Sequence, residues 1–367
     1  MNALLLMALL SGLPGKATTV NTALITKPGG KPTHLDTVGT VYAATANVSM
    51  VASGDFNMDG HNDIATVSSS GAKLNVFINK GDGTFFNKVE YTTEATPQAL
   101  TVGDFNNDGK LDILVTGYNG KLVSRFLGVG DGTFGAKADI ITPSTRPTGI
   151  ASGFLNADSN LDFVTTQDSS RLGVYLGAGN GTFASEVYYA TNAGSSGPRI
   201  VDINNDGKMD VVVNNGTYIS VFTGVGDGTL NAKVDYTHAG ANFTMARAFD
   251  TNNDGWIDLI GCDYNGYIWV FLNNGDGTFA AATGYSNGNA VSAAFGDFNY
   301  DGRMDIAVGD NTSHPSIMYG TPTGFAAYFR IGTVNGGYLL VDHFKSNSTW
   351  DLVQGTGSNL VVFLSVK

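Results

Sequence analysis

A short acidic motif recurs along the chain at a nearly constant interval. Its first position falls at residues 55, 104, 154, 202, 250, 297 and 343, so successive copies are 46 to 50 residues apart. A period of this length predicts a linear array or a closed propeller. A Gly-Asp/Asn-Gly-Thr turn keeps the same interval at residues 81–85, 130–134, 179–183, 226–230 and 275–279. Such a turn between apolar segments is typical of a β-hairpin.

The second repeat shows how one unit is built. Its apolar segments are too short for helices, and we expect strands at Gln98–Val102, Leu111–Thr116, Leu122–Leu127 and Ala136–Ile141. Four antiparallel strands in each of seven units predict an all-β protein, a seven-bladed β-propeller. The 49 glycines and the 14% of charged residues leave no room for substantial helix.

The repeats predict a single propeller domain over residues 18–367, because propeller blades do not fold alone. Approximate blades are 46–95, 96–145, 146–194, 195–241, 242–288, 289–332 and 333–367. The last blade has no fourth strand before the chain ends. We expect a strand within His34–Ala43 to supply it, which closes the ring and removes two sheet edges.

Five of the acidic motifs are complete, with oxygen-bearing residues at positions 1, 3, 5 and 9 and Gly at position 6. Carboxylates crowded onto one turn repel each other unless a hard cation neutralises them, and Ca²⁺ accepts irregular oxygen cages. We therefore predict about five Ca²⁺ ions, with His61, Lys110, Lys208, Trp256 and Arg303 contributing backbone carbonyls only. The predicted ligands are Asp55, Asn57, Asp59, His61, Asp63; Asp104, Asn106, Asp108, Lys110, Asp112; Asp202, Asn204, Asp206, Lys208, Asp210; Asp250, Asn252, Asp254, Trp256, Asp258; Asp297, Asn299, Asp301, Arg303 and Asp305.

The alternative interpretation is an ordinary Asn/Asp/Gly turn, because these residues bond their own backbone without a metal. The Asp at position 9, which a turn does not need, favours calcium. An EF-hand is excluded because position 12 is Thr, Val or Gly rather than Glu.

The third and seventh motifs are incomplete. Phe154 and Ser159 replace the first Asp and the Gly of the third motif, which leaves at best a weak site. The seventh motif places Lys345 inside the cage and retains only Asp351 of the acidic positions. Since a lysine repels a cation, we expect no ion there.

The repeated Gly-Asp-Phe-Asn-x-Asp-Gly-x-x-Asp, as in Gly54–Asp63 and Gly296–Asp305, is followed by Asn-x-Gly-Asp-Gly-Thr-Phe, as in Asn79–Phe85. This pattern resembles the FG-GAP/VCBS repeat of integrin-α-type propellers from about residue 46 onward. The resemblance implies calcium between the first and second strands of a blade. It also implies partner-binding loops on the opposite face.

The formal charge of −12 does not indicate a basic partner, because fifteen of the 32 acidic residues lie in the five complete motifs. Five Ca²⁺ ions would offset most of this charge. With no basic stripe to neutralise phosphates, nucleic acid is not an expected ligand. The single Cys262 excludes an intrachain disulfide and is expected to be buried and inert.

Residues 1–17 contain an apolar stretch, Ala3–Leu10, that is similar to the core of a secretory signal and too short to span a bilayer. We expect a secreted or cell-surface monomer without a transmembrane segment, because extracellular calcium fills low-affinity sites.

No catalytic motif accompanies the five His residues. We therefore expect ligand binding by loops opposite the metal face, where Tyr118, Tyr218, Tyr264 and Tyr267 offer aromatic surfaces to a glycan or an extracellular protein. Three functions follow as hypotheses. They are a non-catalytic binding or adhesion module, a polysaccharide lyase or sugar dehydratase, and a structural unit of a surface layer or appendage.

Overall fold

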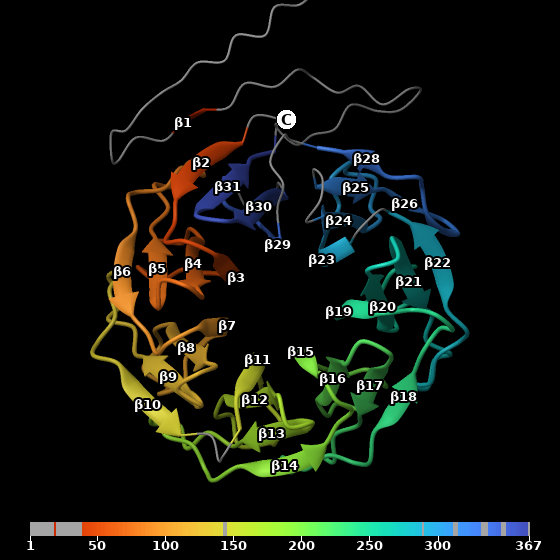
Figure 1. The fold of residues 1–367 in the computed structure, drawn as a ribbon, viewed down its shortest axis with the longest axis horizontal. Helices are drawn as coiled ribbons and strands as arrows, with labels where there is room; N and C mark the ends of the chain where they lie inside the picture. Colours follow the sequence, from red (N-terminus) through yellow and green to blue (C-terminus); the bar gives the residue numbers. More distant parts are fainter. Residues whose placement is uncertain are drawn as a thin grey trace, which may run out of the picture.

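The computed structural model describes residues 18–19, 39–141, 145–287, 290–310, 315–331, 337–345 and 350–365. Throughout these ranges the regular elements are β-strands, which form seven antiparallel blades around a central axis (Figure 1). The predicted seven-bladed, all-β propeller is confirmed. In the part of the chain described here, no helix is long and apolar enough to span a membrane.

Blades one to six run outward from the centre in chain order. Blades one to three are β3 (Val48–Gly54), β4 (Asp63–Ser68), β5 (Lys73–Phe77), β6 (Val89–Thr92); β7 (Pro97–Gly103), β8 (Asp112–Gly117), β9 (Leu122–Phe126), β10 (Ala138–Ile141); β11 (Pro147–Gly153), β12 (Asp162–Gln167), β13 (Arg171–Tyr175) and β14 (Val187–Ala190). Blades four and five are β15 (Ser196–Val201), β16 (Asp210–Asn214), β17 (Ile219–Phe222), β18 (Val234–Tyr236); β19 (Phe243–Phe249), β20 (Asp258–Asp263), β21 (Tyr267–Phe271) and β22 (Thr283–Ser286). The strands predicted for the second repeat agree with β7 to β10 within about two residues.

Blade six departs from the repeat at its outer side. It contains β23 (Ala290–Gly296), β24 (Asp305–Asp310), β25 (Ser316–Met318) and a short fourth strand, β28 (Phe329–Arg330). A small hairpin of β26 (Gly320–Thr321) and β27 (Gly324–Phe325) stands where the other blades have the Asp-Gly turn. The sequence prediction did not include this hairpin.

The seventh blade is completed from the other end of the chain. It contains β29 (Tyr338–Asp342), β30 (Asp351–Thr356) and β31 (Asn359–Phe363), and β2 (Thr40–Ala43) pairs antiparallel with β31. This confirms the predicted closure. A further short strand that was not predicted, β1 (Thr18–Thr19), pairs with β2.

A tyrosine contact shows that β2 serves as a true fourth strand. Tyr91 in β6 accepts a hydrogen bond from the backbone N–H of Phe134 in the next blade (3.1 Å), and Tyr189 in β14 does the same for Leu230 (2.9 Å). Tyr42 in β2 accepts the corresponding bond from Phe85 in blade one (3.1 Å). The joint between the last and first blades is therefore built like the other joints.

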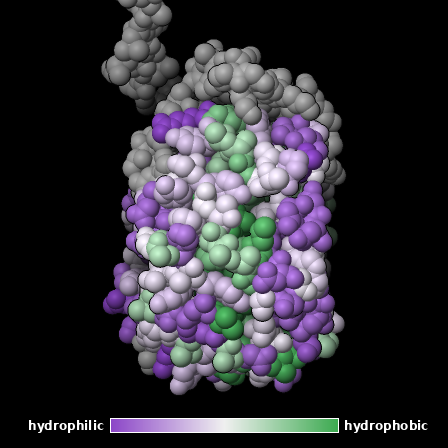
Figure 2. All heavy atoms as spheres, turned by 90° about the vertical axis from the view of Figure 1, so that its right-hand side faces the viewer, coloured by the Kyte–Doolittle hydropathy of each residue, from purple (hydrophilic) through white to green (hydrophobic). Residues whose placement is uncertain are grey.

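Burial follows the position of a strand within its blade. Every residue of β4, β8 and β12 is buried, because neighbouring blades cover both faces of the second strand. The fourth strands at the rim, such as β6 and β14, are largely exposed. Figure 2 shows the outer wall with an apolar band along its middle and hydrophilic residues toward both faces of the ring.

Candidate functional site

The acidic loops all lie on one face of the ring, where first strands end and second strands begin. Strand direction alternates within a blade, so the Asp-Gly turns share this face. The turns between second and third strands lie on the opposite face, together with the connections between blades. The structure thus separates the predicted metal residues from the predicted tyrosines.

The five complete loops fold on themselves in the same way. The first Asp accepts hydrogen bonds from the backbone N–H groups at positions 5 and 6, at 2.8 to 3.2 Å. The Asn at position 3 accepts from the N–H at position 5, and the Asp at position 5 accepts from the N–H at position 7. These bonds gather the predicted side chains of positions 1, 3 and 5 around one turn.

The backbone of each complete loop needs two left-handed residues. In blade one these are Met58 (φ 62°) and Gly60 (φ 87°), at positions 4 and 6. Left-handed conformations are easiest for Gly, which explains the Gly at position 6 of every complete motif. In blade three Ser159 adopts φ 66° at this position without the glycine.

The ninth-position Asp has a role that the sequence interpretation missed. In all seven blades its Oδ2 accepts the N–H of position 2, and its Oδ1 accepts an N–H just after the third strand, at 2.7 to 3.0 Å. The side chain is fully buried in every blade. Each blade therefore uses this Asp to join its loop to its third strand, contrary to the expectation that the turn does not need it. Its retention as Asp162 and Asp351 in the incomplete motifs was the signal available in the sequence.

Burial dominates the electrostatics of these carboxyls. It raises the pKa of Asp63 and of Asp112 to about 6 and that of Asp305 to about 7, against the bonds from the backbone amides. The carboxylates at positions 1 and 5 of the same loop raise these pKa values further. A cation beside the loop would favour the ionised form.

The loops also connect neighbouring blades. The carbonyl of Phe56, at position 2 in blade one, accepts the N–H of Gly132 in the Asp-Gly turn of blade two (3.0 Å). Gly132 has φ 84°, and a Cβ at this residue would lie 2.7 Å from Ile78 of blade one. Equivalent bonds join Gly181 to Phe105 and Gly228 to Leu155. Holding the acidic loop rigid therefore also holds the joint between two blades.

Donor chemistry in the complete loops fits a hard cation. The loops offer only oxygen ligands, and a carboxylate has about four acceptor positions, so the amide bonds do not exhaust positions 1, 5 and 9. In its present arrangement Asn57 Nδ2 donates to Asp59 Oδ2 at 2.8 Å, so the loop bonds partly to itself. Among the described residues, no three His, Cys, Asp or Glu side chains converge as a metal-binding group.

The predicted tyrosines lie on the opposite face but in three different blades. Tyr118 follows β8 and is covered by Arg146, whose guanidinium carbon lies 5.1 Å from the ring centre. Tyr218 precedes β17 and is partly buried. Tyr264, in the turn after β20, and Tyr267, the first residue of β21, are 54% and 40% exposed. Of the four predicted tyrosines, only these two are largely exposed.

Two residues that the sequence interpretation did not select complete the cluster in blade five. Trp269 lies two positions after Tyr267, on the same side of β21, and their ring centres are 5.2 Å apart. His238, from the connection between blades four and five, stacks on Trp269 at 3.7 Å. Trp269 Nε1 donates to Asp263 Oδ2 at 2.9 Å, which fixes the indole. The alternation of aromatic residues in Tyr267-Ile-Trp269 could have predicted that Trp269 lies beside Tyr267. The sequence offers no such signal for His238, which reaches Trp269 only because blade four packs on blade five.

Comparison with known proteins agrees with this architecture. The FG-GAP-like repeat matches residues 55–115, 104–153, 155–213, 202–260 and 250–308, and the chain belongs to this family. No curated protein matches the sequence.

Solved structures share the fold at low identity. The BBS1N propeller, solved in complex with ARL6DN and soaked with mercury, aligns with a TM-score of 0.63 at 11% identity, covering 89% of this chain and 94% of that one. An Agrocybe aegerita lectin, described as recognising non-reducing terminal N-acetylglucosamine, aligns with a TM-score of 0.55 at 19% identity, covering 78% of this chain and 80% of that one. These similarities establish the propeller fold.

Proposed function

We propose that this protein is a secreted or surface-exposed, non-catalytic binding module that holds a glycan on the face opposite its acidic loops. The observation that carries the proposal is the blade-five cluster of Tyr267, Trp269 and His238, with Tyr264 exposed in the same turn. Tyr267 is exposed and Trp269 and His238 are half-buried beside it. Aromatic surfaces of this kind cover the apolar face of a sugar, and neighbouring amides and carboxylates bond its hydroxyls. Asn265 in the same turn supplies such an amide, although its Nδ2 also donates to Gly240 O at 2.9 Å.

The proposal includes about five Ca²⁺ ions that stabilise the ring from the other face. Its support is the donor chemistry of the five complete loops and their contacts with the next blade. An ion held at positions 1, 3, 5 and 9 and by the carbonyl at position 7 would lock each loop, and through it the joint between blades. The calcium is therefore structural, and it lies too far from the blade-five cluster to contact a ligand there.

Structural relatives support a binding role without specifying the ligand. One shares its fold with this chain and recognises a terminal sugar, and the other was solved with a protein partner. The apolar segment at residues 3–10 and the proposed calcium sites support export.

A glycan array of the intact protein, with and without EDTA, tests the proposal. We expect selective binding without turnover, and at least a tenfold loss of affinity in Tyr267→Ala and in Trp269→Ala. Tyr188→Ala is the matched control, because Tyr188 is 57% exposed on β14 in blade three. Release of a modified product from a polysaccharide would identify an enzyme instead. If the molecule binds an extracellular protein and no glycan, the proposed glycan ligand is wrong and the ligand is a protein.

A further inference from the structure

The central channel contains a second set of polar groups, independent of both faces. A cavity of about 480 Å³ is lined by the first strands of the seven blades. A smaller cavity of about 120 Å³ adjoins it on the side of the tyrosine face, where the first strands begin. No Asp or Glu lines either cavity. Arg199, Arg247 and Tyr338 line both, so they lie where the two cavities meet.

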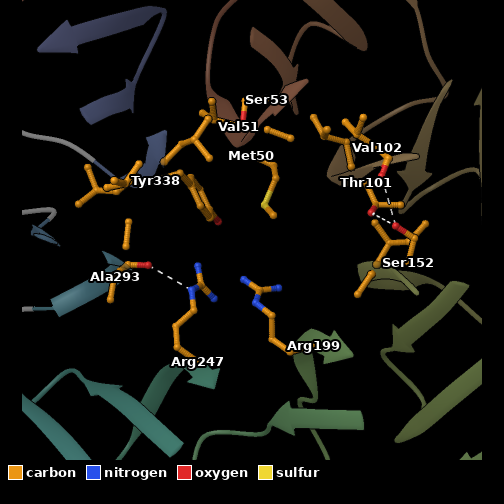
Figure 3. Close-up of a pocket in the computed structure, with 18 of the residues that line it drawn as sticks. Met50, Val51, Ser53, Thr101, Val102, Ser152, Arg199, Arg247, Ala293 and Tyr338 are labelled. Carbon is orange, nitrogen blue, oxygen red and sulfur yellow. Dashed lines mark hydrogen bonds between the residues drawn. The ribbon is translucent and has the colours of Figure 1, made fainter. Parts of the chain in front are cut away.

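The two arginines occupy equivalent places in neighbouring blades. Arg199 of β15 and Arg247 of β19 each lie three residues before the first position of an acidic motif. The corresponding residues of the other blades also line the channel and are small or apolar: Ala52, Thr101, Ala151, Ala294 and Leu340. The ring thus places two adjacent guanidinium groups opposite short side chains, which leaves space in front of them (Figure 3).

These guanidinium groups have few protein partners. Arg247 donates from Nε to Ala293 O and from Nη1 to Ala246 O, both at 3.1 Å. Arg199 donates from Nη1 to Pro198 O at 2.8 Å. A guanidinium has five N–H donors, so most donors of the pair have no acceptor among the described residues. No carboxylate in that part of the chain forms an ion pair with either arginine.

The electrostatics make this arrangement unfavourable without a counterion. Surrounding protein lowers the pKa of Arg199 to about 10, and burial together with the charge of Arg199 lowers the pKa of Arg247. Arginine nevertheless stays protonated at neutral pH. Two like charges side by side, partly removed from water, are costly unless an anion joins them.

We propose that the channel binds a small oxyanion, a carboxylate, sulfate or phosphate group, between Arg199 and Arg247. The planar guanidinium groups match such oxygens in a two-pronged geometry. Figure 3 shows both arginines reaching into the same space from β15 and β19, with Met50 and Tyr338 nearby. Burial raises the pKa of Tyr338, which keeps its phenol protonated and able to donate a further bond. The apolar remainder of the cavity has room for the body of a small acid. This site requires neither calcium nor the blade-five cluster.

Calorimetric titration of the intact protein at constant ionic strength tests this proposal. The probes are sulfate, phosphate and D-galacturonate, with D-galactose as the uncharged control. We expect at least one anion to bind with one-to-one stoichiometry, and galactose not to bind at this site. Binding of sulfate or phosphate indicates a free inorganic ion, and binding of galacturonate alone indicates the carboxylate of a small acid.

Substitutions place the binding in the channel. Arg199→Gln and Arg247→Gln should each weaken it at least tenfold, whereas Arg330→Gln on the exposed strand β28 should not change it. Trp269→Ala should also leave it intact, which separates this site from the proposed glycan site. If the Gln variants do not fold, protection of Arg199 and Arg247 from phenylglyoxal by the anion, measured by mass spectrometry on the wild type, replaces them. Absence of saturable binding, unchanged binding in the Gln variants, or no protection would overturn the proposal.

Discussion

Blades one, two, four, five and six carry complete acidic motifs, whereas blades three and seven do not. Even so, the first three strands of every blade pair antiparallel in the same order. The ninth-position Asp is shared by all of them and makes the same two backbone contacts. Positions 1 and 6 differ: blade three has Phe154 and Ser159 there. The ninth position therefore belongs to the fold, and the first position is dispensable for it.

The absence of the first Asp from blade three supports calcium binding by the complete loops. A turn that folds without the first Asp does not require the carboxylate crowding of the complete motifs. Crowding that the fold does not need costs stability unless something neutralises it. The comparison thus predicts that positions 1, 3 and 5 respond to calcium and that position 9 matters with or without it.

The largest expected effect is the removal of calcium from the five complete loops. A site at 100 times its Kd contributes about 2.7 kcal/mol, and 1 kcal/mol shifts Tm by roughly 1–2 °C in a chain of this length. EDTA should therefore lower Tm by on the order of 10 °C, measured by calorimetry against a sodium chloride control of equal ionic strength. An unchanged Tm would refute a structural role for calcium.

The second effect concerns the ninth position and should not depend on calcium. Asp162→Ala in blade three and Asp112→Ala in blade two each leave two buried N–H groups without acceptors, which costs about 3 kcal/mol. Urea unfolding in EDTA should give similar losses for both variants. Asp158→Ala, at an exposed position of the same blade-three loop, should cost less than about 1 kcal/mol. A loss in Asp112→Ala that is seen in calcium but disappears in EDTA would mean that position 9 acts only through the ion.

The sequence allowed the repeat, the turns and the closing strand to be predicted because these depend on local chemistry. Asp-Gly turns and β-branched segments specify their own conformation. The last repeat has only three strands, so its fourth strand had to come from the N-terminal region. The hairpin of β26 and β27 was missed because Gly320–Phe325 lacks the Asp-Gly motif. Within the candidate site, calcium binding by positions 1, 3, 5, 7 and 9 stays a prediction, and the structural role of position 9 was missed.

Contacts between blades explain what the sequence could not reveal. His238 meets Trp269 only because blade four packs on blade five. Arg199 and Arg247 are 48 residues apart, and nothing local shows that both point into the channel. Ring closure brings equivalent positions together, so such sites emerge when repeats are compared position by position around the ring.

A third, smaller effect compares single positions of a complete and an incomplete loop. Asp206→Ala in blade four should remove one ion and cost about 2 kcal/mol in calcium, with no further cost in EDTA. Asp158→Ala, at the same position in blade three, should remove none. Elemental analysis of the purified protein counts the ions, with five expected in the wild type. A count of seven, or loss of an ion from the blade-three variant, would contradict the distinction between the two kinds of loop.

The smallest expected effect is on the pH dependence of calcium binding, and it follows from the raised pKa values at the ninth position. Asp63 and Asp112, with pKa values of about 6 in the metal-free protein, must lose their protons to bind an ion. Calcium affinity should therefore be constant above about pH 7 and fall roughly tenfold by pH 5, about 1.4 kcal/mol per site.

Without calcium, the stability of the fold should depend on pH in the opposite direction. A carboxyl whose pKa is higher in the folded than in the unfolded chain stabilises the fold at low pH, and this contribution is lost as the pH rises from about 4 through 6 to 7. The calcium-free protein should thus have a higher Tm at pH 5 than at pH 7.5, whereas the calcium-induced gain in Tm should be larger at pH 7.5. Calorimetric scans at both pH values, with calcium and with EDTA, measure the two trends together. A gain from calcium that is equal at pH 5 and pH 7.5 would show that the ninth-position Asp is not a ligand, and that the ions, if bound, are held by positions 1, 3, 5 and 7 alone.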